Sequence, residues 1–365
     1  MGVNMQQNQL MKITAIYTVL FAVCVFAVIF YYSANKIVGV EIEETPEEII
    51  QSTETAIQES TDNKVESLLN QNGIIFEQND QEMNYFCIPL HESVKAESVM
   101  IENHYMDKEL WVSIRQSVTD DVFENFYHTQ GVYGNREAVS EGYFESSDGT
   151  FWLKFKLNDI YEYHSIFEDS KLYVEFVSPK EVYDRIVVID PAYGGEVTGA
   201  VSGELEGKDV TLSIARALKE KLDKTDIKVY YTRMDDSHPS DENRIDLTNP
   251  VKADLMIRIE VNENEDTKIY GTEAVYNGKF FIPGFGSPEL ADLLERNVAT
   301  QISGKANGLV DSTDEDIVIN SATVPAAAIR VGYVSNGQEA ILLNREDYID
   351  KIAEGIFMAI MAAYE

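Results

Sequence analysis

The segment RIVVIDPAYGG, Arg185–Gly195, decides the fold, because a short apolar strand runs directly into a turn that contains two glycines. An amphipathic helix is expected next, with Val210, Ile214, Leu218 and Leu222 on one face. Strands and helices continue to alternate in the order KVYYT, a short helix near residue 245, DLMIRI, PELADLLERNVATQI, AAAIRV and a closing helix over 348–363. This alternation predicts an α/β domain whose sheet carries helices on both faces.

Six motifs follow one another in this region, and their order is more informative than the fold class. They are IDPAYGG (189–195), GKDVTLSIARAL (207–218), YYTR (230–233), NRIDLTNPVKADLMIRIEVN (243–262), GTEAVY (271–276) and IRVGYVSN (329–336). Their order and spacing resemble the N-acetylmuramoyl-L-alanine amidase family, the zinc-dependent type that cleaves the bond between the muramic acid lactyl group and the first alanine of the peptide. The resemblance covers about 180 residues, from Arg185 to the end of the chain.

The resemblance implies a particular zinc site. In that family a His in the first motif, a Glu just before the Lys-Asp pair of the second, and a His at the end of the fourth hold the metal. These ligands leave one coordination position for a water molecule, whose pKa the zinc lowers toward neutrality. A Glu in the last motif serves as the general base and passes the proton to the leaving amine.

All four of these positions carry other residues in this chain. Tyr193 stands at the first His position, and its phenol, with a pKa near 10, is a poor zinc ligand. Gly207 falls at the Glu position, although a one-residue shift would bring in the neighbouring Glu206. Glu260 occupies the second His position, and Arg330 replaces the general base, a role that a guanidinium cannot perform.

These replacements predict a pseudoenzyme with no catalytic residues and no cofactor, because such zinc sites need nitrogen or sulfur donors. The domain's single histidine, His238, lies in a polar loop and is expected to be solvated. The residues expected to line the former metal pocket are Tyr193, Glu206, Glu260, Asn262 and Arg330. Arg330 would then stand in for the ion beside the carboxylates. One alternative places Glu260 and Arg330 in solvent, and another has calcium or magnesium held by oxygen ligands.

The residues that shape the backbone in the family are retained. They are Asp190, Pro191, Gly194, Gly195, Asp209, Leu212, Arg244, Ser335 and Asn336. Turn geometry and core packing account for them without catalysis. The domain is therefore expected to keep the family fold without the family chemistry.

Residues 13–32, ITAIYTVLFAVCVFAVIFYY, carry no charge, and a helix of this length crosses about 30 Å of hydrocarbon. They predict a transmembrane anchor, with residues 1–12 in the cytoplasm. The later domains would be extracytoplasmic in a single-pass protein of the cell membrane, on the evidence of Lys12 and of the domain assignment. The alternative, a cleaved signal peptide, usually has a shorter apolar core and small residues before the cut.

Three further segments follow the anchor. Residues 33–82 are expected to form an acidic, solvated linker, because they are rich in Glu, Gln, Thr and Ser. Residues 83–182 alternate polar and apolar side chains in runs such as TFWLKFKL, which predicts a small β-sandwich that resembles the AMIN-type domain. Residues 183–365 form the amidase-like domain. Cys87, in the apolar run YFCIPL, is expected to be a buried free thiol.

Composition narrows the function classes. The chain has 365 residues, with 63 acidic and 29 basic side chains and a formal charge of −34. Nucleic acid and anionic lipid surfaces are therefore excluded as partners, since binding phosphates relies on cations. The 44% hydrophobic content is ample for folded cores.

Three functional hypotheses remain. The preferred one is a membrane-anchored, catalytically inactive cell-wall protein that binds peptidoglycan, a muropeptide or a partner cell-wall protein, and so regulates wall hydrolysis. The rival is an active amidase with an unusual metal site, zinc included, built on Glu206 and Glu260. The third is a scaffold that touches no glycan.

Overall fold

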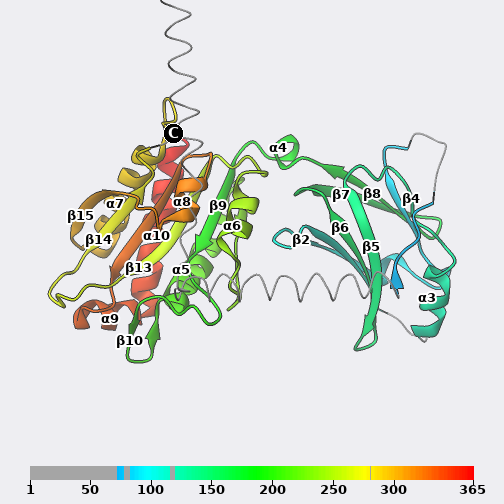
Figure 1. Ribbon diagram of the computed structural model, residues 1–365, viewed down its shortest axis with the longest axis horizontal. Helices are drawn as coiled ribbons and strands as arrows, with labels where there is room; N and C mark the ends of the chain where they lie inside the picture. The colour runs from blue at the N-terminus through cyan, green and yellow to red at the C-terminus, as the bar shows by residue number, and fades with distance from the viewer. Residues whose placement is uncertain (1–71, 78–82, 116–119, 280) are drawn as a thin grey trace, which may run out of the picture. The chain divides into compact units, whose positions relative to one another are not determined.

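The computed structural model describes residues 72–77, 83–115, 120–279 and 281–365 (Figure 1). No helix in these ranges is both long enough and apolar enough to cross a bilayer. The cytoplasmic segment expected at 1–12, the anchor expected at 13–32 and most of the linker expected at 33–82 lie outside the described residues.

The α/β domain is built on a mixed sheet with the strand order β12-β9-β13-β16-β14-β15 (Figure 1). The strands are β9 (Ile186–Pro191), β12 (Lys228–Tyr231), β13 (Leu255–Asn262), β14 (Thr272–Tyr276), β15 (Ala306–Asp311) and β16 (Ala326–Tyr333). Strands β12, β9, β13 and β16 are parallel, whereas β14 runs antiparallel to β16. The carboxyl ends of the four parallel strands therefore meet at one edge of the sheet, where open α/β sheets bind their ligands.

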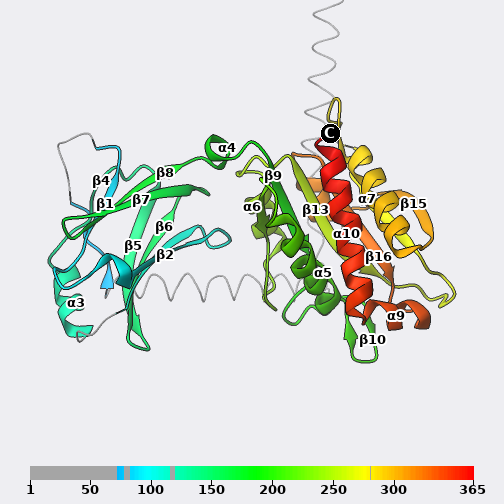
Figure 2. The same ribbon diagram turned by 180° about the vertical axis from the view of Figure 1, so that it is seen from behind.

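Helices cover both faces of this sheet, which confirms the predicted α/β class. One face packs against α5 (Gly207–Leu222), α7 (Ser287–Ile302) and α10 (Glu346–Ala363), which lie together in front of the strands in Figure 2. The other face packs against α6 (Asp241–Thr248) and α8 (Ile317–Ser321). Two smaller elements complete the domain, the β10 (Val201–Ser202) and β11 (Leu205–Glu206) hairpin and helix α9 (Gly337–Leu343).

Alternation along β13 decides where its charged residues lie. Leu255, Ile257 and Ile259 belong to the core under α5, α7 and α10, whereas Met256 belongs to the core under α6 and α8. Because successive side chains of a strand point to opposite faces, Arg258, Glu260 and Asn262 share the α6 and α8 face with Met256.

The β-rich domain consists of two antiparallel four-stranded sheets, ordered β4-β1-β8-β7 and β2-β3-β6-β5. The strands are β1 (Phe86–Pro89), β2 (Val99–His104), β3 (Glu109–Arg115), β4 (Tyr133–Gly134), β5 (Val139–Ser147), β6 (Thr150–Leu157), β7 (Glu162–Glu168) and β8 (Lys171–Val177). The core takes side chains from both sheets, for example Phe86 and Phe155, whose rings meet edge to face at 5.1 Å. The predicted antiparallel strands are thus present, together with an unpredicted helix, α3 (Asp120–Tyr127). The AMIN resemblance stays a prediction.

One expected boundary is wrong. Residues 72–77 were expected to belong to the linker, but Ile74 is 6% exposed and lies in the core of the β-rich domain. Gly73 pairs with Tyr143 of β5, and Phe76 pairs with Val132. The short apolar run GIIF explains why these residues join the domain, because burying its side chains is favourable although the surrounding segment is polar. Cys87 is buried and free, as expected.

Candidate functional site

The strand register brings oppositely charged residues side by side on the α6 and α8 face of the sheet. Arg258 of β13 is opposite Asp190 of β9, and Glu260 of β13 is opposite Arg330 of β16. Arg330 is also opposite Glu273 of β14. Side chains at facing positions are close enough to interact, so backbone pairing assembles this cluster of charges.

Arg330 contacts three carboxylates. Its Nε donates to Glu260 Oε2 at 3.1 Å, its Nη1 to Glu273 Oε1 at 2.9 Å, and its Nη2 to Asp316 Oδ1 at 3.4 Å. The second oxygen of Glu260 accepts from Arg258 Nε at 2.7 Å. The side chain of Arg330 is only 25% exposed and that of Glu260 only 12%, which contradicts the alternative that the pair is solvated.

Asp190 forms the buried end of the same network. It accepts from Arg258 Nη1 at 2.5 Å, from Thr232 Oγ1 at 2.5 Å, and from Arg244, whose side chain is fully buried. Burial alone would raise the pKa of the Asp190 carboxyl, but Arg244 and Arg258 outweigh it and lower the pKa to about 2. Asp190 is therefore charged at every physiological pH.

The network thus alternates cations and anions from Arg244 through Asp190, Arg258 and Glu260 to Arg330, which ends on Glu273 and Asp316. Burial works against the charged forms of Arg258 and Arg330, yet the neighbouring carboxylates raise the pKa of both. Three guanidinium groups face four carboxylates, so the protein itself supplies the positive charge that these buried anions need. We call these seven side chains the ionic network.

The remaining expected pocket residues separate into two groups. Asn262 donates to Glu273 at 3.2 Å, and the Tyr193 hydroxyl donates to the Val261 carbonyl at 3.2 Å, so both lie beside the ionic network. Glu206 does not belong to it, because its carboxylate faces Lys208 Nζ at 3.5 Å. The rival hypothesis of an oxygen-rich metal site on Glu206 and Glu260 stays a prediction.

Gly207 shows why the loop cannot easily supply a ligand. A Cβ atom at this position would lie 2.6 Å from Val261 Cγ2 and 3.3 Å from the backbone of Ala200, so no side chain fits without local movement. The N–H of Gly207 donates to the Ala200 carbonyl at 2.9 Å, which holds the start of α5 close to the hairpin.

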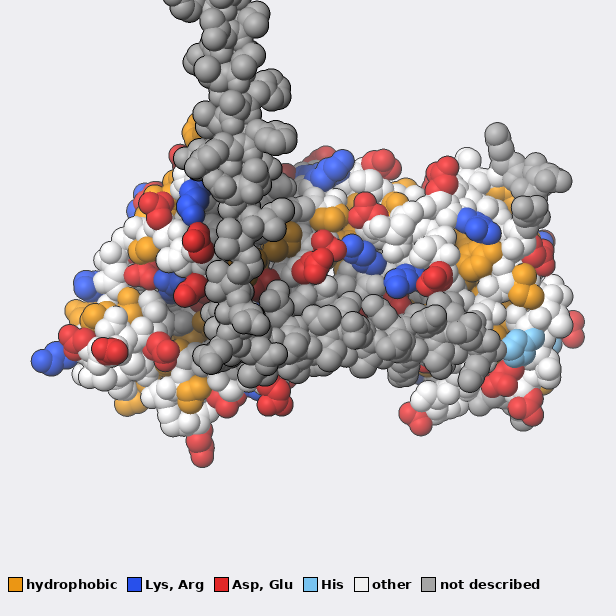
Figure 3. Space-filling view, viewed as in Figure 1, with side chains coloured by type: hydrophobic (Ala, Val, Ile, Leu, Met, Phe, Trp, Pro, Cys, Tyr) orange, Lys and Arg blue, Asp and Glu red, His pale blue; other side chains and the backbone are white. Residues whose placement is uncertain are grey.

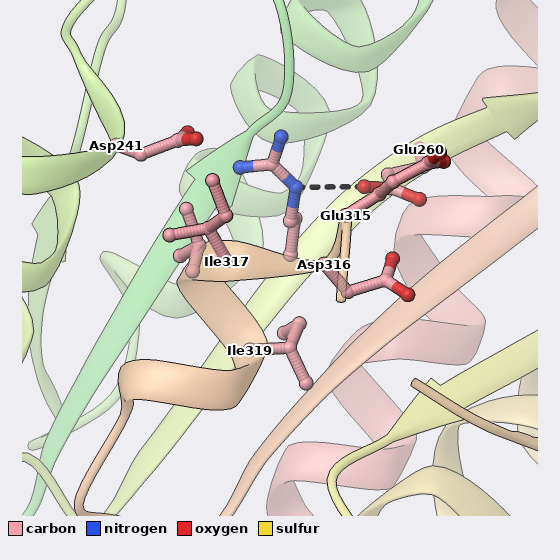
Figure 4. Close-up of a pocket in the computed structure, with 8 residues that line it drawn as sticks. Asp241, Glu260, Glu315, Asp316, Ile317 and Ile319 are labelled. Carbon is pink, nitrogen blue, oxygen red and sulfur yellow. Dashed lines mark hydrogen bonds and ion pairs between the residues drawn. The ribbon is translucent and has the colours of Figure 1, made fainter. Parts of the chain in front are cut away.

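The residues present do not fit the zinc ion that the fold implies. In the described part of the chain, no group of three or more His, Cys, Asp and Glu side chains is placed to hold a metal ion. Figure 4 shows the Glu260 carboxylate bonded to a guanidinium, with Asp241 on the opposite side of that guanidinium. The cavity there is about 40 Å³, far below the roughly 300–1,000 Å³ of small-molecule sites.

Sequence reasoning missed part of the ionic network. Asp190 and Arg244 were assigned only to turn geometry and packing, and Arg258, Glu273 and Asp316 were not singled out. A signal existed for Arg258, because the runs LMIRIEVN and AAAIRVGY place charged residues inside otherwise apolar strands. Such charges are rarely buried without partners.

Replacing Arg330 with Met should lower the free energy of unfolding by about 1.5–3 kcal/mol, because Glu260, Glu273 and Asp316 each lose a charged donor. Urea denaturation of the full-length protein in detergent, followed by circular dichroism, measures the loss. Arg296→Met is the matched control, since Arg296 is 63% exposed and pairs with Asp292 one helical turn away. If both variants lose the same free energy of unfolding, the ionic network stabilises the fold no more than an exposed ion pair does.

The α/β sheet, the six motifs in their order and the placement of Tyr193, Glu260 and Arg330 at one sheet edge define an amidase-like cell-wall domain. A family model for N-acetylmuramoyl-L-alanine amidases matches residues 187–362. The germination-specific N-acetylmuramoyl-L-alanine amidase of Bacillus subtilis is 31% identical over 193 residues, in a match that covers 48% of this chain and 78% of that protein. The chain therefore belongs to the N-acetylmuramoyl-L-alanine amidase family.

Other relatives cover a similar share of the chain. The B. subtilis amidase LytC is 25% identical over 183 residues, which are 50% of this chain but 36% of LytC. Among solved structures, an N-acetylmuramoyl-L-alanine amidase from Clostridium difficile 630 is 30% identical, with a TM-score of 0.46, over 49% of this chain and 95% of that chain. The residues that the family model matches belong to the α/β domain, and each of these relatives covers about half of the chain.

Proposed function

We propose that this protein is a membrane-anchored, catalytically inactive cell-wall protein, whose amidase-like domain binds peptidoglycan peptide or a wall protein and so regulates wall hydrolysis. The observation that carries the proposal is the position of Arg330. It stands where the general base would act, and it bonds to Glu260, which stands at a metal-ligand position. A permanent cation there repels a metal ion and cannot accept a proton.

The ligand class follows from the family. The names of the relatives describe enzymes that act on the amide between muramic acid and L-alanine. A domain that keeps the family fold but lacks the zinc ligands is suited to bind peptidoglycan, or the proteins that process it, without cleaving it. On the face shown in Figure 3, Lys and Arg side chains lie singly among Asp and Glu, so the described residues of this face form no basic stripe for nucleic acid.

The test combines metal analysis, turnover and binding on the full-length protein in detergent. We expect far less than one zinc per chain, no release of peptide from purified peptidoglycan, and co-sedimentation with insoluble peptidoglycan. An active family member that carries the His, Glu and His ligands is the positive control for turnover.

Two outcomes would contradict the proposal. One zinc per chain together with turnover that disappears in Glu260→Gln would establish the rival, an active amidase. No zinc, no turnover and no retention on peptidoglycan would leave only the partner-protein form of the proposal, and a failure to co-purify with wall proteins from cross-linked cells would reject that form as well.

A further inference from the structure

Lys228 lies at the centre of a polar cluster that joins the α/β domain to the β-rich domain. Its Nζ is 2.8 Å from Glu162 Oε1. It also lies 5.1, 4.9 and 5.0 Å from the ring centroids of Tyr105, Tyr183 and Tyr230, respectively. Lys228 begins β12, whereas Glu162 begins β7 and Tyr105 directly follows β2. We call these five side chains the tyrosine cage.

Glu162 is the anion of the tyrosine cage and is 9% exposed. The Tyr230 hydroxyl donates to Glu162 Oε1 at 2.5 Å, and the Tyr105 hydroxyl donates to the same oxygen at 3.0 Å. Lys228 Nζ donates to the Tyr105 hydroxyl at 3.1 Å. A buried carboxylate with this set of partners is tolerated, and loss of one partner leaves it uncompensated.

The two tyrosines that bond to Glu162 act as permanent donors. Burial raises the pKa of Tyr105 and of Tyr230, and the Glu162 carboxylate raises both further. Their rings also meet edge to face, with centroids 4.8 Å apart and an interplanar angle of 84°. The tyrosine cage therefore combines charge-assisted hydrogen bonds, one ion pair and aromatic packing.

The other end of β12 supports the ionic network. Thr232, the residue after β12, donates to Asp190 Oδ1 at 2.5 Å, and Arg233 Nε donates to the Pro191 carbonyl at 2.9 Å. Within its sheet β12 is an edge strand that pairs only with β9. Edge strands need cover, because half of their backbone groups have no partner within the sheet. The short strand thus connects the tyrosine cage, at Lys228, with the Asp190 end of the ionic network.

We propose that the β-rich domain is a permanent structural partner of the α/β domain. The β-rich domain clamps edge strand β12 through the ion pair between its Glu162 and Lys228 of β12. The clamp holds the strand that supports Asp190, so the β-rich domain helps to shape the amidase-like site from outside it. A module that is only tethered by a linker would leave β12 unaffected when the contact is removed. This inference does not depend on whether the amidase-like domain is active.

Hydrogen exchange measured by mass spectrometry on the full-length protein in detergent tests the clamp. Glu162→Gln and Lys228→Met should each speed exchange in peptides covering β12 and β9 by about a hundredfold, since each strands a buried partner. The double variant should exchange more slowly than the product of the two single effects predicts, because it removes both charges together. The controls are Glu168→Gln, an exposed position of β7, and Lys224→Met, an exposed position before β12.

Tyr230→Phe is the milder variant, because it removes only the hydroxyl that bonds to Glu162, and it should speed exchange of β12 by several-fold. This variant still tests the clamp if Glu162→Gln fails to fold. Exchange of β12 that stays within twofold of the unmodified protein in all of these variants would overturn the clamp. So would faster exchange confined to β7. Neither result would affect the expected absence of zinc and turnover.

Discussion

Replacing Arg244 with Met is expected to lower the free energy of unfolding by about 3–5 kcal/mol, because the change strands the fully buried carboxylate of Asp190. Arg244 also donates to the Pro239 carbonyl at 3.0 Å and to the Tyr193 carbonyl at 3.0 Å. Met keeps most of the volume, so the loss reports hydrogen bonds and charge more than a cavity. Urea denaturation of the full-length protein, followed by circular dichroism, measures it.

The control for this prediction is a surface arginine on another helix. Arg296→Met removes an exposed pair, for which we expect a loss below about 1 kcal/mol. A double-mutant cycle then isolates the pair, because Asp190→Asn should cost less in the Arg244→Met background than in the unmodified protein. If Arg244→Met costs no more than Arg296→Met, the ionic network does not stabilise the fold.

The sequence predicts the α/β architecture well because its signals are local. Residues 186–189 form a continuous apolar run, typical of a strand buried on both faces, and Val210, Ile214 and Leu218 repeat at helical spacing. Each pattern depends only on which face of an element is buried. No local signal predicts that β14 runs antiparallel to β16, because the pattern of apolar residues in a strand does not depend on the direction of its neighbour.

The site was predictable only where the motifs carry it. Glu260 and Arg330 were expected to lie together, and Arg330 Nε is 3.1 Å from Glu260 Oε2. The bond between Asp190 and Arg258 depends on the register of β9 against β13, which no local pattern contains. The position of Glu206 depends on the path of the β10 and β11 hairpin, which places its carboxylate 3.5 Å from Lys208 Nζ.

Acid should reveal the charge on Asp190. Its pKa in the folded protein is about 2, below the ordinary value of 3.8, so the folded state binds the proton less readily than the unfolded state. A lowered carboxyl pKa stabilises the fold above about pH 4, and this stabilisation disappears as the pH falls through about 2. The difference between the two values corresponds to about 2 kcal/mol, which is lost between these limits.

Asp190→Asn should therefore have two effects that can be separated by pH. At neutral pH it leaves the buried guanidinium of Arg244 without its anion, and we expect a loss of about 3–5 kcal/mol. Between pH 4 and pH 2 the variant should lose about 2 kcal/mol less than the unmodified protein, because the titrating group is gone. Denaturation curves across this range measure both effects, with Asp223→Asn as the control, since Asp223 is 56% exposed beside Lys219. An unchanged slope below pH 4 in Asp190→Asn would mean that other carboxyl groups carry the acid sensitivity and that Asp190 is not the charged end of the ionic network.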